Sequence, residues 1–355
     1  MRIAVMGGAL VNSGDFLIEQ RSKELMEAIT DAKVDILKRN ISYDDKVDVL
    51  NGYDMIVFAG GPIFQRNIYP KRIPFVRKLT KINTPIRIFG GGWKGYNISH
   101  RVMYKKYKFT KEMMSFINNI SKQYPLGCRD WYTMRTLQKS NVKNLIMTGC
   151  PAWYDLSKID SLKLDKKYND STISDSVTIG ISDPALPCNK PYFYGLVNFI
   201  VRKYHNANIK LFFHRGISKE DLAKVKLLCK KYSKLAYVDL SGSAEGFKQY
   251  NQCFLHIGFR VHAHIYNLSQ GNVSVLINED ARGIGVNHAL GIENIDCLLK
   301  NSRFFKPSVS NQILETIVLD YLRYIEKSGY MQYRRAYKQI REYFNVAKSF
   351  IAGMI

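Results

Sequence analysis

The sequence predicts an α/β protein of two Rossmann-like domains that face each other across a cleft, with a C-terminal helical segment. At 355 residues the chain exceeds what one hydrophobic core usually holds, which favours two domains. Apolar runs of strand length alternate with helical patterns over residues 1–155 and again over 177–305, which is typical of βαβ units and parallel sheets. The polar, charged stretch 156–176 is the candidate linker between them, and 306–355 forms the helical end.

Six apolar runs predict the strands of the N-terminal domain, and they are Ile3–Met6, Val34–Leu37, Met55–Ala59, Ile86–Phe89, Leu126–Arg129 and Leu145–Thr148. The pattern between them predicts helices at Phe16–Ile29, Pro74–Leu79, Phe109–Ser121 and Trp131–Lys139. Glycines follow several of these strands, as in Gly7-Gly8 and Gly60-Gly61. Because glycine permits sharp turns and a close approach of backbone to ligand, these strand ends are candidates for binding.

The alternation restarts in the C-terminal domain. The predicted strands are Val177–Ile181, Ile209–Phe213, Ala236–Val238, Phe254–Gly258 and Val273–Ile277. The predicted helices are Tyr192–Tyr204, Lys219–Tyr232, Ala244–Gln252 and Arg260–Ser269. Two consecutive α/β units of similar size that face each other across a cleft form the GT-B arrangement, and residues 311–355 predict one or two further helices.

The formal net charge of +23 indicates an anionic partner. The candidates are nucleic acid, anionic lipid and phosphorylated small molecules. Nucleic acid is the least favoured because the sequence has no zinc finger, basic zipper or RNP-type aromatic strand, and its basic residues are spread along the chain.

The remaining composition predicts a cytoplasmic protein without a resident metal or cofactor. The six cysteines are scattered with no C-x-x-C pair, which favours reduced thiols over disulfides or a zinc site. No run of eighteen apolar residues is present, and the chain opens on a strand pattern instead of a signal segment.

The C-terminal segment interleaves tyrosines with basic residues from Tyr321 to Lys348. Such a pattern fits a helix that packs on the domains and exposes a basic face. It equally fits an interfacial helix on anionic lipid, which would make the protein peripheral on the cytoplasmic membrane face. The two interpretations are compatible.

The strongest candidate site is the stretch Gly258–Ile265, where an apolar strand pattern meets a helix pattern. Open α/β sheets bind their ligands at this position, outside the carboxyl ends of the strands. Arg260 supplies a permanent, fork-shaped cation for phosphate or carboxylate, and His262 supplies a proton that moves near neutral pH. A core role for His262 is the alternative, whereas His264 is expected to be structural.

Other strand ends offer further candidate ligands. The loop after the first strand carries Asn12 and Asp15, which could cap a helix or hold sugar hydroxyls, and its backbone could attract an anion. Gly61 is a candidate for close backbone contact. Arg129, followed by Asp130, could form a surface ion pair or bind an anion.

The pair His214-Arg215 closes a strand of the second domain and is expected to reach the same cleft, unless it is merely solvated. The pair Asp280 and Arg282, after the last predicted strand, is expected to form an ion pair or fix the neighbouring loop.

Taken together, these residues resemble the polysaccharide pyruvyl transferase family over most of residues 1–300. The resemblance rests on the order and spacing of Asn12-x-Gly14-Asp15, Asp54 with Gly60-Gly61, Arg129-Asp130, Thr148–Ala152 and the aromatic-Arg260-x-His262 element. The segment Phe213–Gly216 departs from the family pattern, so the roles of His214 and Arg215 rest on their positions alone.

The resemblance implies a GT-B-like enzyme that transfers a pyruvyl group from phosphoenolpyruvate to two hydroxyls of a sugar, giving a cyclic ketal. Arg260 and His262 match the catalytic Arg-x-His, and Arg129 matches an arginine expected at the donor. The acceptor would be a lipid-linked or nucleotide-linked sugar of a surface-polysaccharide precursor, bound on the side of the N-terminal domain, with the donor on the other side. The donor is a substrate, and no cofactor is implied.

Two alternatives from other classes remain. A GT-B glycosyltransferase would use a nucleotide sugar, although the chain lacks the paired-glutamate element often found near such sites. A non-catalytic protein that binds anionic glycan or lipid would depend on the charge of +23 and would tolerate replacement of His262.

Overall fold

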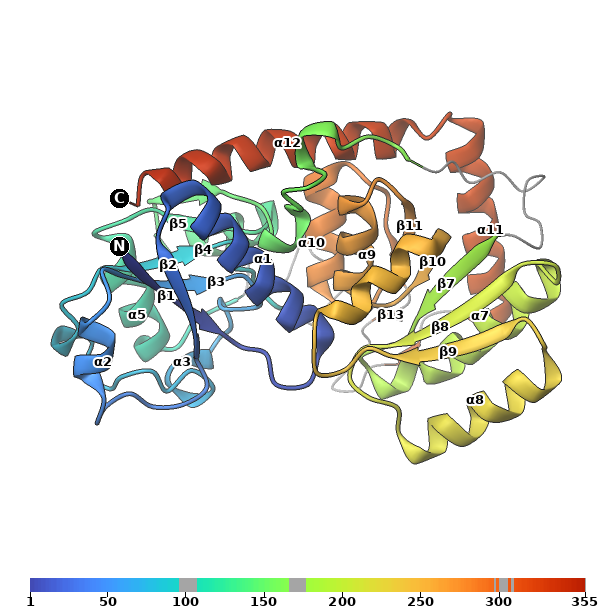
Figure 1. Cartoon of the computed structure of the whole chain (residues 1–355), viewed down its shortest axis with the longest axis horizontal. Helices are drawn as coiled ribbons and strands as arrows, with labels where there is room; N and C mark the ends of the chain where they lie inside the picture. Colours follow the sequence, from blue (N-terminus) through green and yellow to red (C-terminus); the bar gives the residue numbers. More distant parts are fainter. Residues whose placement is uncertain (96–106, 166–176, 297, 300–305, 308–309, 355) are drawn as a thin grey trace.

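The protein contains two parallel sheets, each flanked by helices, that lie next to each other (Figure 1). The structure, a computed structural model, describes residues 1–95, 107–165, 177–296, 298–299, 306–307 and 310–354. It has the predicted fold class, two Rossmann-like domains of the GT-B type. The domain boundaries stay predictions, and residues 166–176 of the expected linker lie outside the described residues.

The N-terminal sheet has the order β2-β1-β3-β4, and every pairing is parallel. A bridge between Gly91 and Cys128 extends it to the parallel pair of β5 and β6. The strands are β1 (Arg2–Gly7), β2 (Lys33–Lys38), β3 (Met55–Ala59), β4 (Ile86–Phe89), β5 (Leu126–Cys128) and β6 (Leu145–Met147). All residues of β3 and β4 are buried, as expected of parallel strands covered on both faces.

The C-terminal sheet has the order β12-β11-β10-β7-β8-β9, again with parallel pairings. The strands are β7 (Thr178–Ser182), β8 (Asn208–Phe213), β9 (Leu235–Asp239), β10 (Cys253–Gly258), β11 (Val273–Asn278) and β12 (Ile295–Asp296). A short antiparallel pair joins β13 (Leu298–Leu299) and β14 (Lys306–Pro307). All eleven strands predicted from the sequence are confirmed to within one residue at each end.

Helices cover the faces of both sheets. They are α1 (Ser13–Thr30), α2 (Val47–Asn51), α3 (Ile68–Lys71), α5 (Lys111–Ser121), α6 (Trp131–Lys139), α7 (Lys190–Lys203), α8 (Lys219–Lys231), α9 (Val261–Ser269), α10 (Ala281–Leu290), α11 (Asn311–Lys327) and α12 (Met331–Ala352). Most of the predicted helices are confirmed, and 245–252 is a 3-10 helix.

The predicted helix Pro74–Leu79 is wrong. Phe75 has a positive φ of 32° and forms an isolated β-bridge with Ser42, in which its carbonyl accepts a hydrogen bond from the backbone of Tyr43, so no helix forms there. Helix α10 was missed because its two glycines lower helix propensity. Both are required by packing, since a Cβ at Gly285 would lie 2.8 Å from the carboxyl carbon of Asp130.

Helix α12 runs along both domains, from the C-terminal sheet back to the N-terminal one (Figure 1). Tyr333 donates to the carbonyl of Ser274 in β11, and Phe350 stacks on Phe89 of β4 with ring centroids 6.2 Å apart. The helix therefore fastens one domain to the other.

The tyrosines of α12, Tyr333, Tyr337 and Tyr343, are core residues, with Tyr333 and Tyr337 almost fully buried. They are unavailable to a membrane surface, whereas the basic side chains of Arg334, Arg335 and Lys338 are exposed. The described helices include none with the length and hydrophobicity that crossing a bilayer demands.

Candidate active site

A cavity of about 550 Å³ lies where the carboxyl ends of the two sheets meet. Segments that follow β1, β2 and β3 line one side, and segments that follow β7, β8, β10 and β11 line the other. Its ionisable side chains are Asp15, Arg39, Lys71, Arg72, Lys94, His214, Arg215, Arg260, His262, Glu279, Asp280 and Arg282. Seven of these are Arg or Lys and three are Asp or Glu, so the cavity favours anionic ligands.

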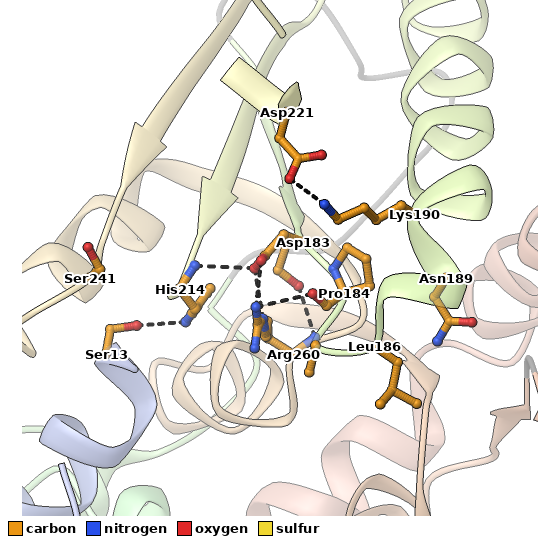
Figure 2. A network of polar contacts seen from close by, with 12 residues as sticks. Ser13, Asp183, Pro184, Leu186, Asn189, Lys190, His214, Asp221, Ser241 and Arg260 are labelled. Atoms are coloured by element: carbon orange, nitrogen blue, oxygen red, sulfur yellow. Dashed lines mark hydrogen bonds and ion pairs between the residues drawn. The ribbon is translucent and has the colours of Figure 1, made fainter. Parts of the chain in front are cut away.

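Arg260 is held in one orientation by a buried ion pair (Figure 2). It sits at the N-cap of α9, and its Nε and Nη2 donate to the two carboxylate oxygens of Asp183 at 2.7 and 2.5 Å. Nη2 also donates to the carbonyl of Pro184 at 3.2 Å. Burial lowers the pKa of Arg260, but Asp183 outweighs it and raises the pKa above its ordinary value. Arg260 is therefore a permanent cation whose position is fixed by its partner.

His262 lies one residue into the first turn of α9 and packs against Gly14 in the first turn of α1. The approach is so close that a Cβ at Gly14 would overlap Nδ1 of the imidazole. Burial is the main cause that lowers the pKa of His262 to about 4, and three arginines, of which Arg282 is the strongest, add to it against the opposing effect of Asp15. The imidazole of His262 is therefore neutral at neutral pH.

His214 joins the two domains through its ring (Figure 2). Its Nδ1 lies 2.8 Å from the hydroxyl of Ser13 in α1, and its Nε2 lies 2.8 Å from the hydroxyl of Tyr250. The side chain is fully buried. Because both ring nitrogens are engaged, the geometry does not support the predicted binding of substrate by the His214 ring. His264 is likewise buried and lies 2.8 Å from the Ser274 hydroxyl, as expected of a structural histidine.

Arg129 is buried behind the cavity instead of lining it. Its Nε donates to Asp130 at 3.1 Å, and its guanidinium packs against Gly92. The geometry therefore does not support direct contact between Arg129 and a donor, although its charge acts on His262. Arg215, in contrast, is exposed and lines the cavity.

On the N-terminal side, Asn12 and Asp15 both line the cavity, and the Asn12 amide donates to the Asp15 carboxylate at 3.0 Å. Gly61 has a positive φ of 66° and lies behind Arg39, while its neighbour Pro62 reaches the cavity wall. Gly61 thus shapes the wall and makes room for Arg39.

Sequence reasoning missed Arg39, which directly follows β2. Its guanidinium lies over Gly8, where a Cβ would overlap it. Burial lowers the pKa of Arg39, and it makes no side-chain hydrogen bond or ion pair with any residue that the structure describes. Arg39 could have been predicted from its position directly after a strand, because the same position led to the prediction of Arg129 and Arg260.

Two further side chains complete the wall. Arg282 pairs with Asp280 at 2.7 Å, as its sequence position predicted. Glu279 accepts hydrogen bonds from the backbone of Ala185 and Leu186 at 2.8 and 2.9 Å, and burial raises its pKa to about 7. Glu279 therefore ties the loop after β7 to the end of β11.

Within the described ranges, no group of three or more His, Cys, Asp and Glu side chains could hold a metal ion. The cavity instead places the imidazole of His262 near Arg260 and Arg282, two arginines that are held by carboxylates. Such an arrangement can bind an anion and move a proton.

Two Rossmann-like domains with a basic cavity between their sheet edges define a protein of the GT-B fold class. Solved structures agree: UDP-GlcNAc 2-epimerase from Neisseria meningitidis bound to UDP-GlcNAc is similar at 11% identity and a TM-score of 0.55, covering 100% of this chain and 99% of that one. A putative UDP-N-acetylglucosamine 2-epimerase from Listeria monocytogenes has 10% identity, the same TM-score, and coverage of 99% and 94%. Such low identity shows the fold alone.

The family is shown by a separate comparison. The model of the polysaccharide pyruvyl transferase family matches residues 12–280, which is most of the chain. The chain belongs to the polysaccharide pyruvyl transferase family, and it is a transferase of polysaccharide biosynthesis. No curated protein matches it.

Proposed function

We propose that this protein transfers a pyruvyl group from phosphoenolpyruvate to two hydroxyls of a sugar in a surface-polysaccharide precursor, forming a pyruvate ketal and releasing phosphate. The observation that carries the proposal is a cavity histidine, His262, that lies among arginines, of which Arg260 and Arg282 are held by carboxylates, at the place where the two domains meet. Family membership supports the same chemistry.

The donor is expected to lie against the C-terminal domain, near His262. Phosphoenolpyruvate carries a carboxylate and a phosphate, and both groups are bound best by arginine forks. Arg260 and Arg282 are each oriented by a carboxylate through Nε and Nη2, which leaves the Nη1 side of each guanidinium for a ligand. Arg215 lines the same side of the cavity.

The enol of the donor is unreactive toward a hydroxyl until its methylene carbon is protonated. A bound carboxylate and phosphate would raise the pKa of His262 from about 4, because negative charge favours the imidazolium. Binding of the donor would thereby favour protonation of His262, which is the proposed acid. Protonation of the methylene leaves an electron-poor C2 that a sugar hydroxyl can attack.

The acceptor is expected on the N-terminal side, where Asn12 and Asp15 can bind hydroxyls. Arg39, Lys71 and Arg72 line this side as well, which suits a sugar that carries phosphate, either lipid-linked or nucleotide-linked. For a lipid-linked precursor, the proposed location is the cytoplasmic face of the membrane.

The direct test is incubation with phosphoenolpyruvate and a panel of nucleotide-linked and polyprenyl-diphosphate-linked sugars. Acceptor-dependent phosphate release and a mass gain on the glycan are expected, with the ketal identified by NMR. Transfer of a glycosyl group from a nucleotide sugar, without consumption of phosphoenolpyruvate, would refute the proposal in favour of a glycosyltransferase.

Replacing Gly14 by Ala should move His262, the proposed acid, out of its catalytic position. The added Cβ would displace the imidazole of His262, and misplacement of a catalytic group by about 1 Å can cost about 10²-fold in rate. We expect a loss of this size in kcat while the protein stays folded. Gly52→Ala is the matched control, because a Cβ there would meet its nearest atom at an ordinary 3.4 Å. Equal activity of both variants would contradict the proposed position of His262.

Binding of the donor should take up a proton. His262 is neutral without an anion, since its pKa is about 4, and the bound donor raises that pKa. Protonation and binding therefore favour each other, so the contribution of His262 to affinity is largest at low pH and is lost as pH rises through the raised pKa. Calorimetry in buffers of different ionisation enthalpy should show less proton uptake for His262→Gln. Identical uptake in both proteins would count against the coupling, because titration of the donor phosphate is common to both.

A further inference from the structure

Asp15 faces His262 from the opposite domain. The carboxylate belongs to the first turn of α1, and the imidazole belongs to the first turn of α9. The contact between Gly14 and the imidazole brings these two turns together, and both side chains line the same cavity. Asp15 exerts the strongest charge effect of any residue on His262. A carboxylate and an imidazole are therefore presented to one ligand from its two sides.

The carboxylate of Asp15 has few partners. Among the described residues its only hydrogen bond from a side chain comes from the Asn12 amide, which reaches Oδ2 at 3.0 Å, and no salt bridge involves it. Its charged surroundings are Glu19 on the same helix, Arg39 after β2, His262 on α9 and Arg282 on α10. Oδ1 is thus an available acceptor in a cavity whose other carboxylates, Glu279 and Asp280, are already engaged.

The proposed reaction needs such an acceptor for protons. The methylene carbon of the donor gains one proton, and each of the two sugar hydroxyls loses one as its oxygen bonds to C2. The bond from C2 to the phosphate oxygen breaks, and phosphate leaves with the electron pair. One hydroxyl proton ends on the departing hydrogen phosphate, and the other must return to the acid. A base close to both the acceptor hydroxyl and His262 would take up that proton as the oxygen attacks and relay it to the acid.

We propose that Asp15 is the general base that takes the proton of the first attacking hydroxyl, an inference that rests on the proposed function. As the acceptor oxygen bonds to C2, its proton passes to Oδ1 of Asp15, while His262 delivers a proton to the methylene carbon. The proton on Asp15 then returns to His262 and restores both groups. The second hydroxyl closes the ketal as phosphate leaves with the remaining proton.

This arrangement divides the acid and the base between the two domains. His262 comes from the C-terminal domain and Asp15 from the N-terminal domain, so the pair exists only when the domains are joined. Ser13 and His214 join them beside the pair, through the backbone bond at 3.0 Å and the side-chain contact at 2.8 Å (Figure 2).

Asp15→Asn tests the base with minimal change of shape. With the sugar of the panel that supports wild-type phosphate release, turnover should fall about 10²–10⁴-fold, while calorimetric affinity for phosphoenolpyruvate stays within a few-fold. Glu24→Gln, which neutralises an exposed carboxylate on the same helix, is the matched control and should keep full turnover. Turnover of Asp15→Asn within about threefold of wild type would overturn the role of Asp15 alone. A wild type that releases no phosphate with any sugar of the panel would overturn the proposed function instead.

Chemical rescue separates a base from a residue that only positions others. Asp15→Ala leaves space in the cavity for formate, a small carboxylate that can accept the hydroxyl proton. Added sodium formate should restore turnover of Asp15→Ala in a concentration-dependent way and should not restore His262→Gln. Loss of turnover without rescue by formate would assign Asp15 a positioning role and overturn its role as the base.

Discussion

His262→Gln is expected to lose about 10²–10⁴-fold in turnover, because it removes the acid that protonates the enol methylene of the donor. Glutamine keeps a polar side chain of similar reach but carries no transferable proton at neutral pH. Affinity for phosphoenolpyruvate should largely survive, since the surrounding arginines carry the binding. Measurement of kcat by phosphate release, together with calorimetry of donor binding, separates the two effects.

The matched control is His205→Gln, which changes an exposed histidine outside the cavity and should leave turnover unchanged. His264 is a poorer control because it is buried against β11, so its replacement affects packing. Near-normal turnover of a folded His262→Gln protein would remove His262 from the mechanism and leave the cavity without its proposed acid.

Arg260→Ala is expected to lose both stability and donor binding. The Asp183 carboxylate would remain buried without its partner, and breaking a buried ion pair in this way costs about 3–5 kcal/mol of unfolding free energy. Arg260→Lys should not restore the protein, because lysine cannot make the two parallel bonds to Asp183. Denaturant unfolding and calorimetric titration with phosphoenolpyruvate measure the two losses.

An exposed pair of the same kind provides the comparison. Arg2 pairs with Asp35 at 3.0 Å, but the two side chains are 53% and 31% exposed. Arg2→Ala should therefore change unfolding free energy by at most about 1 kcal/mol and leave donor affinity unchanged. Equal destabilisation by the two substitutions, or unchanged donor affinity in Arg260→Ala, would contradict the role given to Arg260.

The strands were predictable because burial in a parallel sheet requires uninterrupted apolar runs, and these are visible in the sequence. The run Met55–Ala59, for instance, is β3 without a shift at either end. Helix α10 was not predictable, because its sequence is poor in helix formers and its glycines serve contacts with residues far along the chain, such as Asp130.

The residues of the candidate site were likewise predictable only in part. The position after a buried strand identified Arg260, His262 and Arg215, all of which line the cavity. The same rule selected Arg129, which the fold buries behind the cavity against Asp130. Strand position indicates the edge of the sheet at which a side chain lies, but the direction of the side chain depends on its neighbours.

The sequence by itself determined the α/β class, the eleven main strands and the location of the Arg260–His262 element at a sheet edge, because these follow from local patterns of apolar residues and turns. Only the tertiary structure decided which charged side chains are already paired and which are left to bind a ligand. It paired Arg260 with Asp183, engaged both nitrogens of His214, left Arg39 unpaired among the described residues and set Asp15 opposite His262. These contacts join residues that lie far apart along the chain, some of them in different domains, and no local pattern encodes the distance between them.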